Sequence, residues 1–255
     1  MYQQCAVLRQ SQVSPGVYEL ELNVEEMAAL SQPGQFVMIK SWEGNDPFFL
    51  RPISINSVDR AAGSMTLLYK VKGRGTVHMS HLKPGDTATV LGPLGKGFPV
   101  DSSARRVALI GRGIGIAPLL QLARDYAAQG TELCVYLSAK QDSELYNKSA
   151  FEALGAVVRT TSNPQELITD RMAEDCSEHP FDAAYSCGSN RLGQAMQQLH
   201  KTYGFPAWIS LERHMACGVG ACKGCVCENK DPRTGEPYYA RVCKDGPVFD
   251  VDEVM

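Results

Sequence analysis

The sequence predicts a chain of three parts: an antiparallel β-barrel, a parallel α/β domain and a small C-terminal module. Three observations support this prediction. Short strands separated by turn residues fill residues 1–100, apolar strands alternate with helical stretches over residues 101–208, and glycine and cysteine accumulate over residues 209–255. We take these ranges as the domain boundaries. No long low-complexity linker interrupts the chain, so we expect the three parts to pack together.

The first hundred residues contain regularly spaced runs of apolar and β-branched residues. We expect strands at residues 13–22, 35–39, 65–71 and 87–91. A Pro-Gly pair lies in or just before three of these runs, as is typical of tight turns. Many short strands at even spacing indicate an all-β barrel.

The pattern changes near residue 104, where longer apolar runs begin. We expect strands at residues 107–110, 133–137, 156–160 and 183–187, with a helix over residues 117–123. Strands that alternate with helical stretches favour a parallel sheet covered by helices.

Composition excludes several classes of function. The 255 residues carry a net charge of −3 and are 44% hydrophobic, so a buried core is expected and no basic field exists to hold nucleic acid. No run of about 18 apolar residues predicts a membrane span. The N-terminus lacks a basic segment followed by an apolar run, so we expect no signal peptide and a cytoplasmic protein.

Five of the nine cysteines lie between residues 217 and 243. Cys217, Cys222, Cys225 and Cys243 have the spacing C-x4-C-x2-C-x17-C, which is the plant-type pattern for a [2Fe–2S] cluster. Structural zinc also accepts four thiolates, but zinc ribbons usually pair two C-x2-C knuckles and only one is present here. Cys227 could replace Cys225; we predict that it instead starts a strand that leaves the loop.

A glycine-rich turn, Gly111-Arg112-Gly113-Ile114-Gly115, lies between a predicted strand and a predicted helix. Glycines in this position let the backbone approach a phosphate group. The alternative is a plain turn between strand and helix. No acidic residue marks the end of the next strand, where Lys140 and Asp142 follow, so the sequence does not separate NADH from NADPH.

Two further segments suggest a second anionic ligand. Arg51 is followed by Pro52, Ile53 and Ser54, so that a guanidinium able to pair with phosphate lies close to a hydroxyl. The segment from Lys72 through Gly73 and Gly75 to Thr76 adds glycines and charge at another strand end. Taken alone, Arg51 could form a surface ion pair and residues 73–75 a hairpin turn.

Taken in order, these motifs make a family resemblance visible. The chain contains R-P-I-S-I, K-G-R-G-T, G-x-G-I-G-I-A-P, E-R-x-M-A-C-G-V-G-A-C-x-G-C-V-C and V-C-K-D-G-P-V-F-D in this order. It closely resembles the electron-transfer subunits of type B, NAD-dependent dihydroorotate dehydrogenases, over essentially its whole length. The C-terminal motif is the most specific of the set.

The resemblance implies a ferredoxin–NADP reductase-like fold with FAD on the barrel, NAD(H) on the α/β domain and a [2Fe–2S] cluster at the C-terminus. It also implies an FMN-containing catalytic partner that oxidises dihydroorotate to orotate in pyrimidine biosynthesis, in a heterotetramer of two copies of each subunit. By position, the FAD residues are Arg51, Pro52, Ile53, Ser54, Lys72, Gly73, Gly75 and Thr76. The nicotinamide nucleotide residues are Gly111, Gly113, Gly115, Cys187 and Gly188.

Three departures from the family pattern lie in the nucleotide-binding part. Arg112 and Ser138 stand where the family usually has glycine, and Ser189-Asn190 lacks the proline usual after Cys-Gly. They leave open a divergent relative that serves another FMN-dependent oxidoreductase, such as a dihydropyrimidine enzyme. Two further alternatives do not depend on these departures: a non-enzymatic redox sensor and a related reductase subunit.

Overall fold

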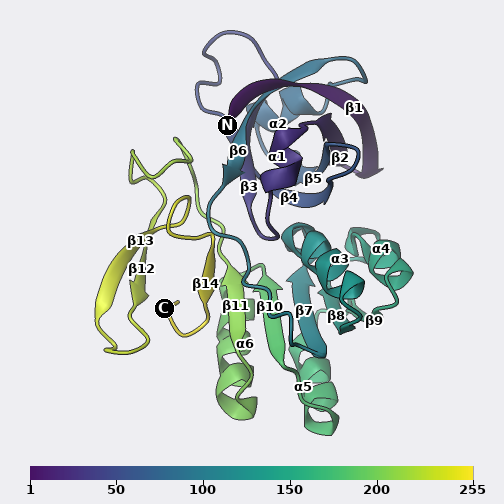
Figure 1. The fold of residues 1–255 in the computed structure, drawn as a ribbon, viewed down its shortest axis with the longest axis vertical. Coiled ribbons are helices and arrows are strands. Elements are labelled where there is room, and N and C mark those ends of the chain that lie inside the picture. Colours follow the sequence, from purple (N-terminus) through teal and green to yellow (C-terminus); the bar gives the residue numbers. More distant parts are fainter. Residues whose placement is uncertain (255) are drawn as a thin grey trace.

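The computed structural model describes residues 1–254 and shows three packed parts (Figure 1). A β-barrel lies at one end, a six-stranded sheet flanked by helices lies at the other, and a cysteine-rich lobe lies beside the sheet. The predicted fold class is confirmed. In the described residues, no helix combines the length and apolar character needed to cross a bilayer.

Six antiparallel strands close the barrel in the order β1-β2-β5-β4-β3-β6. They are β1 (Tyr2–Ser14), β2 (Val17–Asn23), β3 (Phe36–Lys40), β4 (Arg51–Asp59), β5 (Ser64–Lys70) and β6 (Thr87–Leu94). Two short helices, α1 (Glu26–Leu30) and α2 (Arg74–Met79), add Met27 and Met79 to the barrel core. The Pro15-Gly16 turn falls between β1 and β2, so the strand expected at 13–22 begins at Val17.

The second sheet has the order β14-β11-β10-β7-β8-β9. Its strands are β7 (Arg106–Arg112), β8 (Glu132–Ser138), β9 (Val157–Thr161), β10 (Ala183–Cys187), β11 (Ala207–Ser210) and β14 (Val248–Asp250). The first five are parallel, as the alternating pattern predicts, and β14 runs antiparallel to β11.

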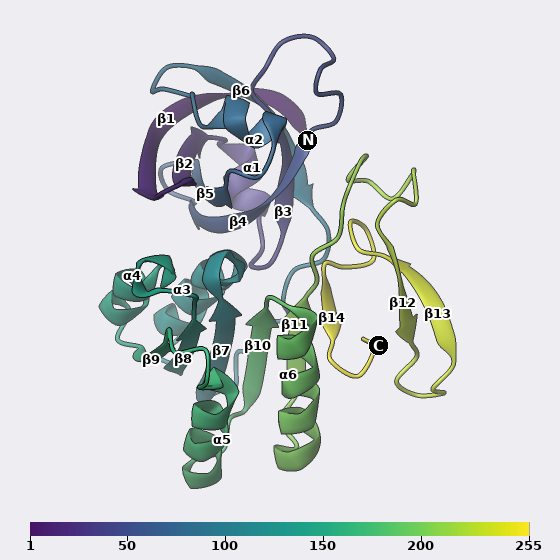
Figure 2. The same cartoon turned by 180° about the vertical axis from the view of Figure 1, so that it is seen from behind.

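Helices cover both faces of this sheet because its strands are apolar on both faces. The helices are α3 (Leu120–Ala128), α4 (Lys148–Ala153), α5 (Ile168–Glu178) and α6 (Asn190–Tyr203), with short 3₁₀ segments η1 (Gly113–Leu119) and η2 (Asp142–Glu144). Leu109 and Val135 share a core with α3 and α4, whereas Ile110 and Tyr136 share one with α5 and α6. Figures 1 and 2 show the two helix pairs.

The strand order places a topological switch point between β7 and β10. After β7 the chain builds β8 and β9 on one side, and then crosses to build β10 and β11 on the other. In open α/β sheets, ligands bind at the carboxyl ends of the strands at such a point. The glycine-rich turn leaves β7 at this position, so the fold places it where a ligand is expected.

The cysteine-rich lobe is tied to the sheet. Its own two-stranded sheet, β12 (Val226–Lys230) paired with β13 (Pro237–Arg241), is followed by β14, which completes the edge of the large sheet. Cys225, Cys243 and Phe249 belong to the same buried cluster as the sheet residue Ile209. The ranges 1–100, 101–208 and 209–255 remain a prediction, and β14 crosses from the third range into the second range's sheet.

The barrel and the α/β part meet through a segment that follows β8. The Lys70 ammonium group lies 3.5 Å from a Glu144 carboxylate oxygen, and the Ser14 and Tyr146 hydroxyls are 3.0 Å apart. The Asn147 amide nitrogen donates to the Asn56 side-chain oxygen at 2.7 Å. These polar contacts border the cleft between the two parts and fix their relative position.

Candidate functional site

The first candidate region joins the start of β4 to the start of α2. Residues 51–54 are half-buried, whereas the next four residues of β4 are fully buried, so the beginning of this strand has an open face. Gly75 lies against the Arg51 side chain: a Cβ atom on Gly75 would come within 2.4 Å of Arg51 Nε. Gly75 therefore leaves the space that the Arg51 guanidinium occupies.

The segment for which a hairpin turn was the alternative interpretation is the start of a helix. Thr76 Oγ1 accepts the backbone N–H groups of Lys72 at 2.9 Å and of Gly73 at 3.1 Å, and it donates to the Gly73 carbonyl at 2.8 Å. This capping arrangement stops β5 and begins α2. The hairpin interpretation is wrong because a hydroxyl three residues after Gly73 satisfies the first free N–H groups of a helix.

The second candidate region is the glycine turn after β7. Gly113 has a φ of +53°, which favours glycine, and the chain continues as the 3₁₀ segment η1 before α3 begins at Leu120. The helix expected at residues 117–123 is thus a 3₁₀ segment up to residue 119. A Cβ atom on Gly115 would come within 2.8 Å of the Cys187 carbonyl oxygen and 3.2 Å of Gly188 Cα. The structure therefore brings the glycine turn against the Cys187-Gly188 stretch.

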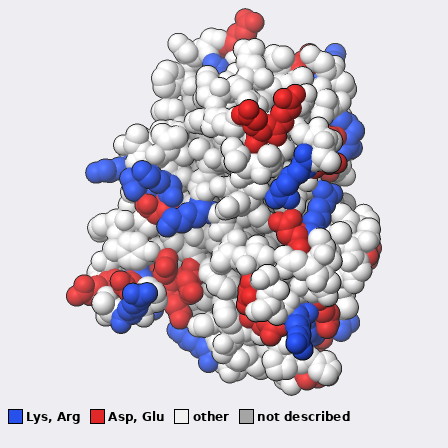
Figure 3. All heavy atoms as spheres, viewed as in Figure 1, with Lys and Arg blue, Asp and Glu red and all other residues white. Residues whose placement is uncertain are grey.

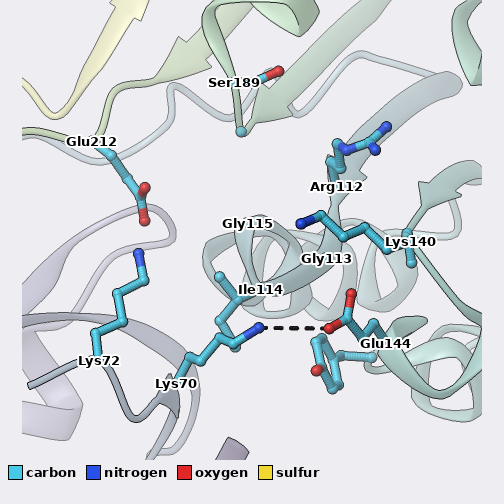
Figure 4. Close-up of a pocket in the computed structure, with 13 residues that line it drawn as sticks. Lys70, Lys72, Arg112, Gly113, Ile114, Gly115, Lys140, Glu144, Ser189 and Glu212 are labelled. Atoms are coloured by element: carbon cyan, nitrogen blue, oxygen red, sulfur yellow. Dashed lines mark ion pairs between the residues drawn. The ribbon is translucent and has the colours of Figure 1, made fainter.

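A cavity of about 320 Å³ joins these two regions (Figure 4). Lys72, from the barrel, lines the same cavity as Gly113, Gly115 and Gly188, from the carboxyl edge of the sheet. Sequence reasoning assigned Lys72 to one ligand and the glycines to another. In the structure Lys72 and these three glycines face one space. The other predicted flavin residues, and Gly111 and Cys187 of the predicted nucleotide set, do not line it.

Several residues that line the cavity were not predicted as site residues. They are Lys70, Arg112, Ile114, Ala139, Lys140, Glu144, Tyr146, Ser189 and Glu212. They come from segments distant in sequence. Arg112 and Ile114 lie in the glycine-rich turn, Lys140 follows a predicted strand and Ser189 departs from the family pattern, whereas the other five carried no sequence signal. Cys187 lies behind the cavity: burial, followed by the charge of Glu212, raises the pKa of its thiol to about 12. Cys187 is therefore a neutral thiol at physiological pH.

The third candidate region is the cysteine loop. Each of the four predicted ligand sulfurs accepts one backbone N–H. The donors are Cys222 to Cys217 at 3.4 Å, Gly224 to Cys222 at 3.4 Å, Cys243 to Cys225 at 3.4 Å and Gly220 to Cys243 at 3.1 Å. Backbone donors to cysteine sulfur are the contacts that stabilise and tune an iron–sulfur cluster.

Two of these contacts join predicted ligands in pairs, Cys217 with Cys222 and Cys225 with Cys243. All nine cysteines are free of disulfide bonds. Within residues 1–254, no three His, Cys, Asp or Glu side chains gather as they would around a single ion. A [2Fe–2S] cluster on four cysteines needs two thiolates for each of its two irons. The four cysteines present here fit a cluster of this kind.

The pKa of the cysteine thiols changes along the loop. Burial opposes ionisation of Cys217, but backbone N–H groups of Cys222, Val219 and Ala221 outweigh it and lower the pKa of this thiol to about 6. Burial and the neighbouring Cys225 thiol raise the pKa of Cys243 to about 12. Cys217 therefore supplies a ready thiolate, whereas Cys243 needs a bound cation before it ionises.

Cys227 lies near Cys225 but makes a different contact from the four predicted ligands. It is on β12, as predicted, and its sulfur lies 3.4 Å from the Asn229 side-chain oxygen. The turn that carries Cys243 is held by Arg241 and Asp245, whose Nε–Oδ2 and Nη2–Oδ1 distances are 2.9 and 3.0 Å. The geometry thus gives Cys227 a partner of its own and holds Cys243 by a bidentate ion pair.

Gly115→Ala is expected to weaken nicotinamide nucleotide binding without loss of the flavin. The added methyl group would meet the backbone at Cys187, which cannot move aside as a side chain can. Overpacking of this kind costs roughly 1–3 kcal/mol, so we expect the NADH concentration for half-maximal flavin reduction to rise about tenfold. Stopped-flow reduction at several NADH concentrations measures this effect, with flavin content as the control. An unchanged NADH dependence would contradict the placement of the nucleotide at this turn.

Comparison with known proteins agrees with the three-part description. Residues 4–98 match the family model described as the oxidoreductase FAD-binding domain. Residues 212–255 match the iron–sulfur cluster binding domain of dihydroorotate dehydrogenase B. The first part is accordingly an FAD-binding domain. The last part is an iron–sulfur module, which decides against zinc.

Solved structures share the fold. A structure of the NADH-dependent reduced ferredoxin-NADP oxidoreductase superposes with a TM-score of 0.83 at 24% identity and covers 98% of this chain and 89% of that one. Ferredoxin-NADP⁺ reductase from Plasmodium falciparum superposes with a TM-score of 0.64 at 16% identity, over 79% of this chain and 91% of that one. The reductase-like fold is thereby confirmed.

Curated relatives match the chain from end to end. A protein of Geobacillus thermodenitrificans is 35% identical over 98% of this chain and 96% of its own length. A protein of Bacillus mycoides is 37% identical over 99% and 98%. Both are named dihydroorotate dehydrogenase B (NAD(+)), electron transfer subunit. With the matching cluster-binding domain, this likeness shows that the chain belongs to the family of dihydroorotate dehydrogenase B electron-transfer subunits.

Proposed function

We propose that this chain transfers electrons between NAD(H) and an FMN-containing catalytic subunit that oxidises dihydroorotate to orotate. Family membership supports this proposal, since the relatives are named for an NAD(+)-linked dihydroorotate dehydrogenase. The observation that carries it is the single cavity shared by the flavin residue Lys72 and the nucleotide residues Gly113, Gly115 and Gly188. A nucleotide held in that cavity lies next to the flavin-binding face of the barrel.

The cysteine loop lies against the same barrel. A Cβ atom on Gly218 would come within 2.5 Å of Met38 Cγ, on β3, and 3.3 Å of Leu94 Cδ1, on β6. Gly218 has a φ of +71°, so glycine both permits the turn and lets the loop contact the barrel directly. This contact places the cluster loop against the FAD-binding domain, as a relay requires.

We assign the binding residues as follows. In residues 1–100, FAD is held by Arg51, Pro52, Ile53, Ser54, Lys72, Gly73, Gly75 and Thr76. In residues 101–208, NAD(H) is held by Gly111, Gly113, Gly115, Cys187 and Gly188. In residues 209–255, the cluster is held by Cys217, Cys222, Cys225 and Cys243. When bound, a flavin exchanges electron pairs with nicotinamide and single electrons with an iron–sulfur cluster. The chain's own task is to hold these groups close together and away from solvent.

The catalytic partner is expected to dock over the cysteine loop. Cys222 is exposed, and Val219 is 47% exposed beside it. The basic residues Arg213, Lys223 and Lys244 are also exposed. Figure 3 shows Lys and Arg side chains gathered at the left, at mid-height, over the region where Figure 1 draws these loops. A basic rim of this kind suits an acidic face on the partner and makes association sensitive to salt.

We place the protein in the cytoplasm as part of the same proposal. All nine cysteines are unpaired, and thiols that must bind iron persist in a reducing compartment. We also propose the heterotetramer of two subunits of each kind.

The test is reconstitution with an FMN-containing catalytic subunit of a type B dihydroorotate dehydrogenase. We expect the complex to reduce NAD⁺ with dihydroorotate, and the isolated catalytic chain to lose this NAD⁺ activity while still reducing an artificial dye. A complex that forms but is inactive with dihydroorotate, and active with another dihydropyrimidine, would contradict the assigned substrate. Mass by light scattering of the complex tests the heterotetramer.

A further inference from the structure

The cavity at the carboxyl edge of the sheet carries more positive than negative charge. Lys70 and Lys72 enter it from the barrel, Arg112 and Lys140 from the ends of β7 and β8. Two carboxylates, Glu144 and Glu212, also line it. The arithmetic of four cations against two anions leaves an excess of two positive charges, which favours an anionic ligand.

Each of the two carboxylates faces one of the two barrel lysines. Glu144 forms the 3.5 Å ion pair with Lys70. Figure 4 shows the Glu212 carboxylate and the Lys72 ammonium group directed toward each other on the opposite side of the cavity. The excess positive charge is therefore that of the remaining two cations, Arg112 and Lys140.

Arg112 and Lys140 lie on neighbouring strand ends. Arg112, the last residue of β7, is the parallel partner of Ser138, the last residue of β8, and Lys140 follows two residues later. Both side chains are exposed, and the described part of the chain shows no ion pair to either. In Figure 4 the Lys140 ammonium group points into the cavity beside the glycine turn, and Arg112 lies on the same side.

Resting on the proposed function, we propose that Arg112 and Lys140 form a two-cation clamp for the diphosphate bridge of the bound nucleotide. The strand ends at the switch point are where a nucleotide phosphate is expected. A guanidinium binds two phosphate oxygens at once, whereas an ammonium group acts as a compact charge. The turn here continues as 3₁₀ structure over Gly113–Leu119. The two side chains therefore supply positive charge that the N-terminus of an α-helix would otherwise direct at a phosphate.

The clamp is tested by ligand binding, without turnover. Calorimetry on the FAD- and cluster-loaded protein measures the Kd of ADP for wild type, Arg112→Gly, Arg112→Lys and Lys140→Ala. We expect Arg112→Gly and Lys140→Ala each to raise this Kd about tenfold, and Arg112→Lys to raise it less, since it keeps the charge but loses the bidentate geometry. Lys148→Ala is the matched control: this exposed lysine on α4 pairs with Glu152 at 3.8 Å and does not line the cavity.

Competing phosphates identify which group the clamp holds. 2′-AMP, which presents a phosphate on the ribose, is expected to bind more weakly than ADP and to respond less to either substitution. Unchanged ADP affinity in Arg112→Gly and Lys140→Ala would overturn the clamp. Tight 2′-AMP binding that both variants abolish would overturn the assignment to the diphosphate. The proposed function fails separately, if wild-type protein binds ADP through the clamp but NADH leaves the flavin oxidised.

Discussion

Cys222→Ser is expected to abolish cluster-dependent electron transfer to the partner while leaving flavin reduction by NADH intact. Cys222 is exposed on the loop, so its replacement spares the core while removing one of the four thiolates. Loss of a group that only hydrogen-bonds to a metal ligand lowers metal affinity about 10- to 100-fold. We therefore expect loss of a direct ligand to lower cluster retention more than about a hundredfold. Iron and sulfide analysis, with the visible absorption of the cluster, measures the loss.

The matched control is Cys227→Ser, the same substitution five residues along the chain. The Cys227 sulfur is buried and contacts the Asn229 side-chain oxygen, so this variant is expected to keep its iron. Cys225→Ser completes the comparison, because Cys225 and Cys227 are the two candidates for the third ligand. A cluster retained in Cys225→Ser and lost in Cys227→Ser would move the ligand to Cys227 and contradict the assignment.

Arg51→Ala is expected to cause the second large effect, a loss of FAD. The Arg51 guanidinium donates to the Phe49 carbonyl at 2.9 Å and lies 5.5 Å from the Trp42 ring centroid, so it is held at the open start of β4. A hydrogen bond to a charged group is worth about 1.5–3 kcal/mol, so FAD affinity should fall roughly 10- to 100-fold. Flavin retained after gel filtration, together with flavin fluorescence, measures the fall.

Two further variants distinguish a role in binding from a role in folding. Gly75→Ala should also weaken FAD, because its methyl group would take the space of Arg51 Nε. Arg74→Ala is the control, since Arg74 is highly exposed and pairs with Asp46 at the surface. If Arg74→Ala loses as much FAD as Arg51→Ala does, the phosphate role of Arg51 is wrong.

Much of the fold could be predicted because local patterns decide it. Strands such as β3, β5 and β8 are short, apolar and bounded by turn residues, so they form where the pattern indicates. The helix at Arg74–Met79 was missed because six residues that include a glycine carry little helical signal, and the Thr76 cap that starts it depends on the exact turn geometry. β14 was missed because three residues are too short to predict a strand without the β11 edge that they pair with.

The candidate site, like the fold, has parts that the sequence predicts and parts that it does not. The four cysteines share a characteristic spacing, so an iron–sulfur module at this end of the chain could be predicted. The division into two pairs could not, because it depends on which backbone N–H points at which sulfur. The cavity could not be predicted either, since Lys70, Lys140 and Glu212 are brought together only by the packing of the barrel on the sheet. Tertiary contacts of this kind leave no trace in local sequence.

The central claim is that the chain connects nicotinamide, flavin and cluster in one protein. Anaerobic addition of NADH to the isolated, fully loaded protein, followed by low-temperature electron paramagnetic resonance, tests it most directly. We predict that NADH bleaches the flavin and produces the signal of a reduced [2Fe–2S] cluster in wild type, and that Cys222→Ser shows the bleaching without that signal. A flavin that stays oxidised under NADH, while dithionite reduces both flavin and cluster, would contradict the account.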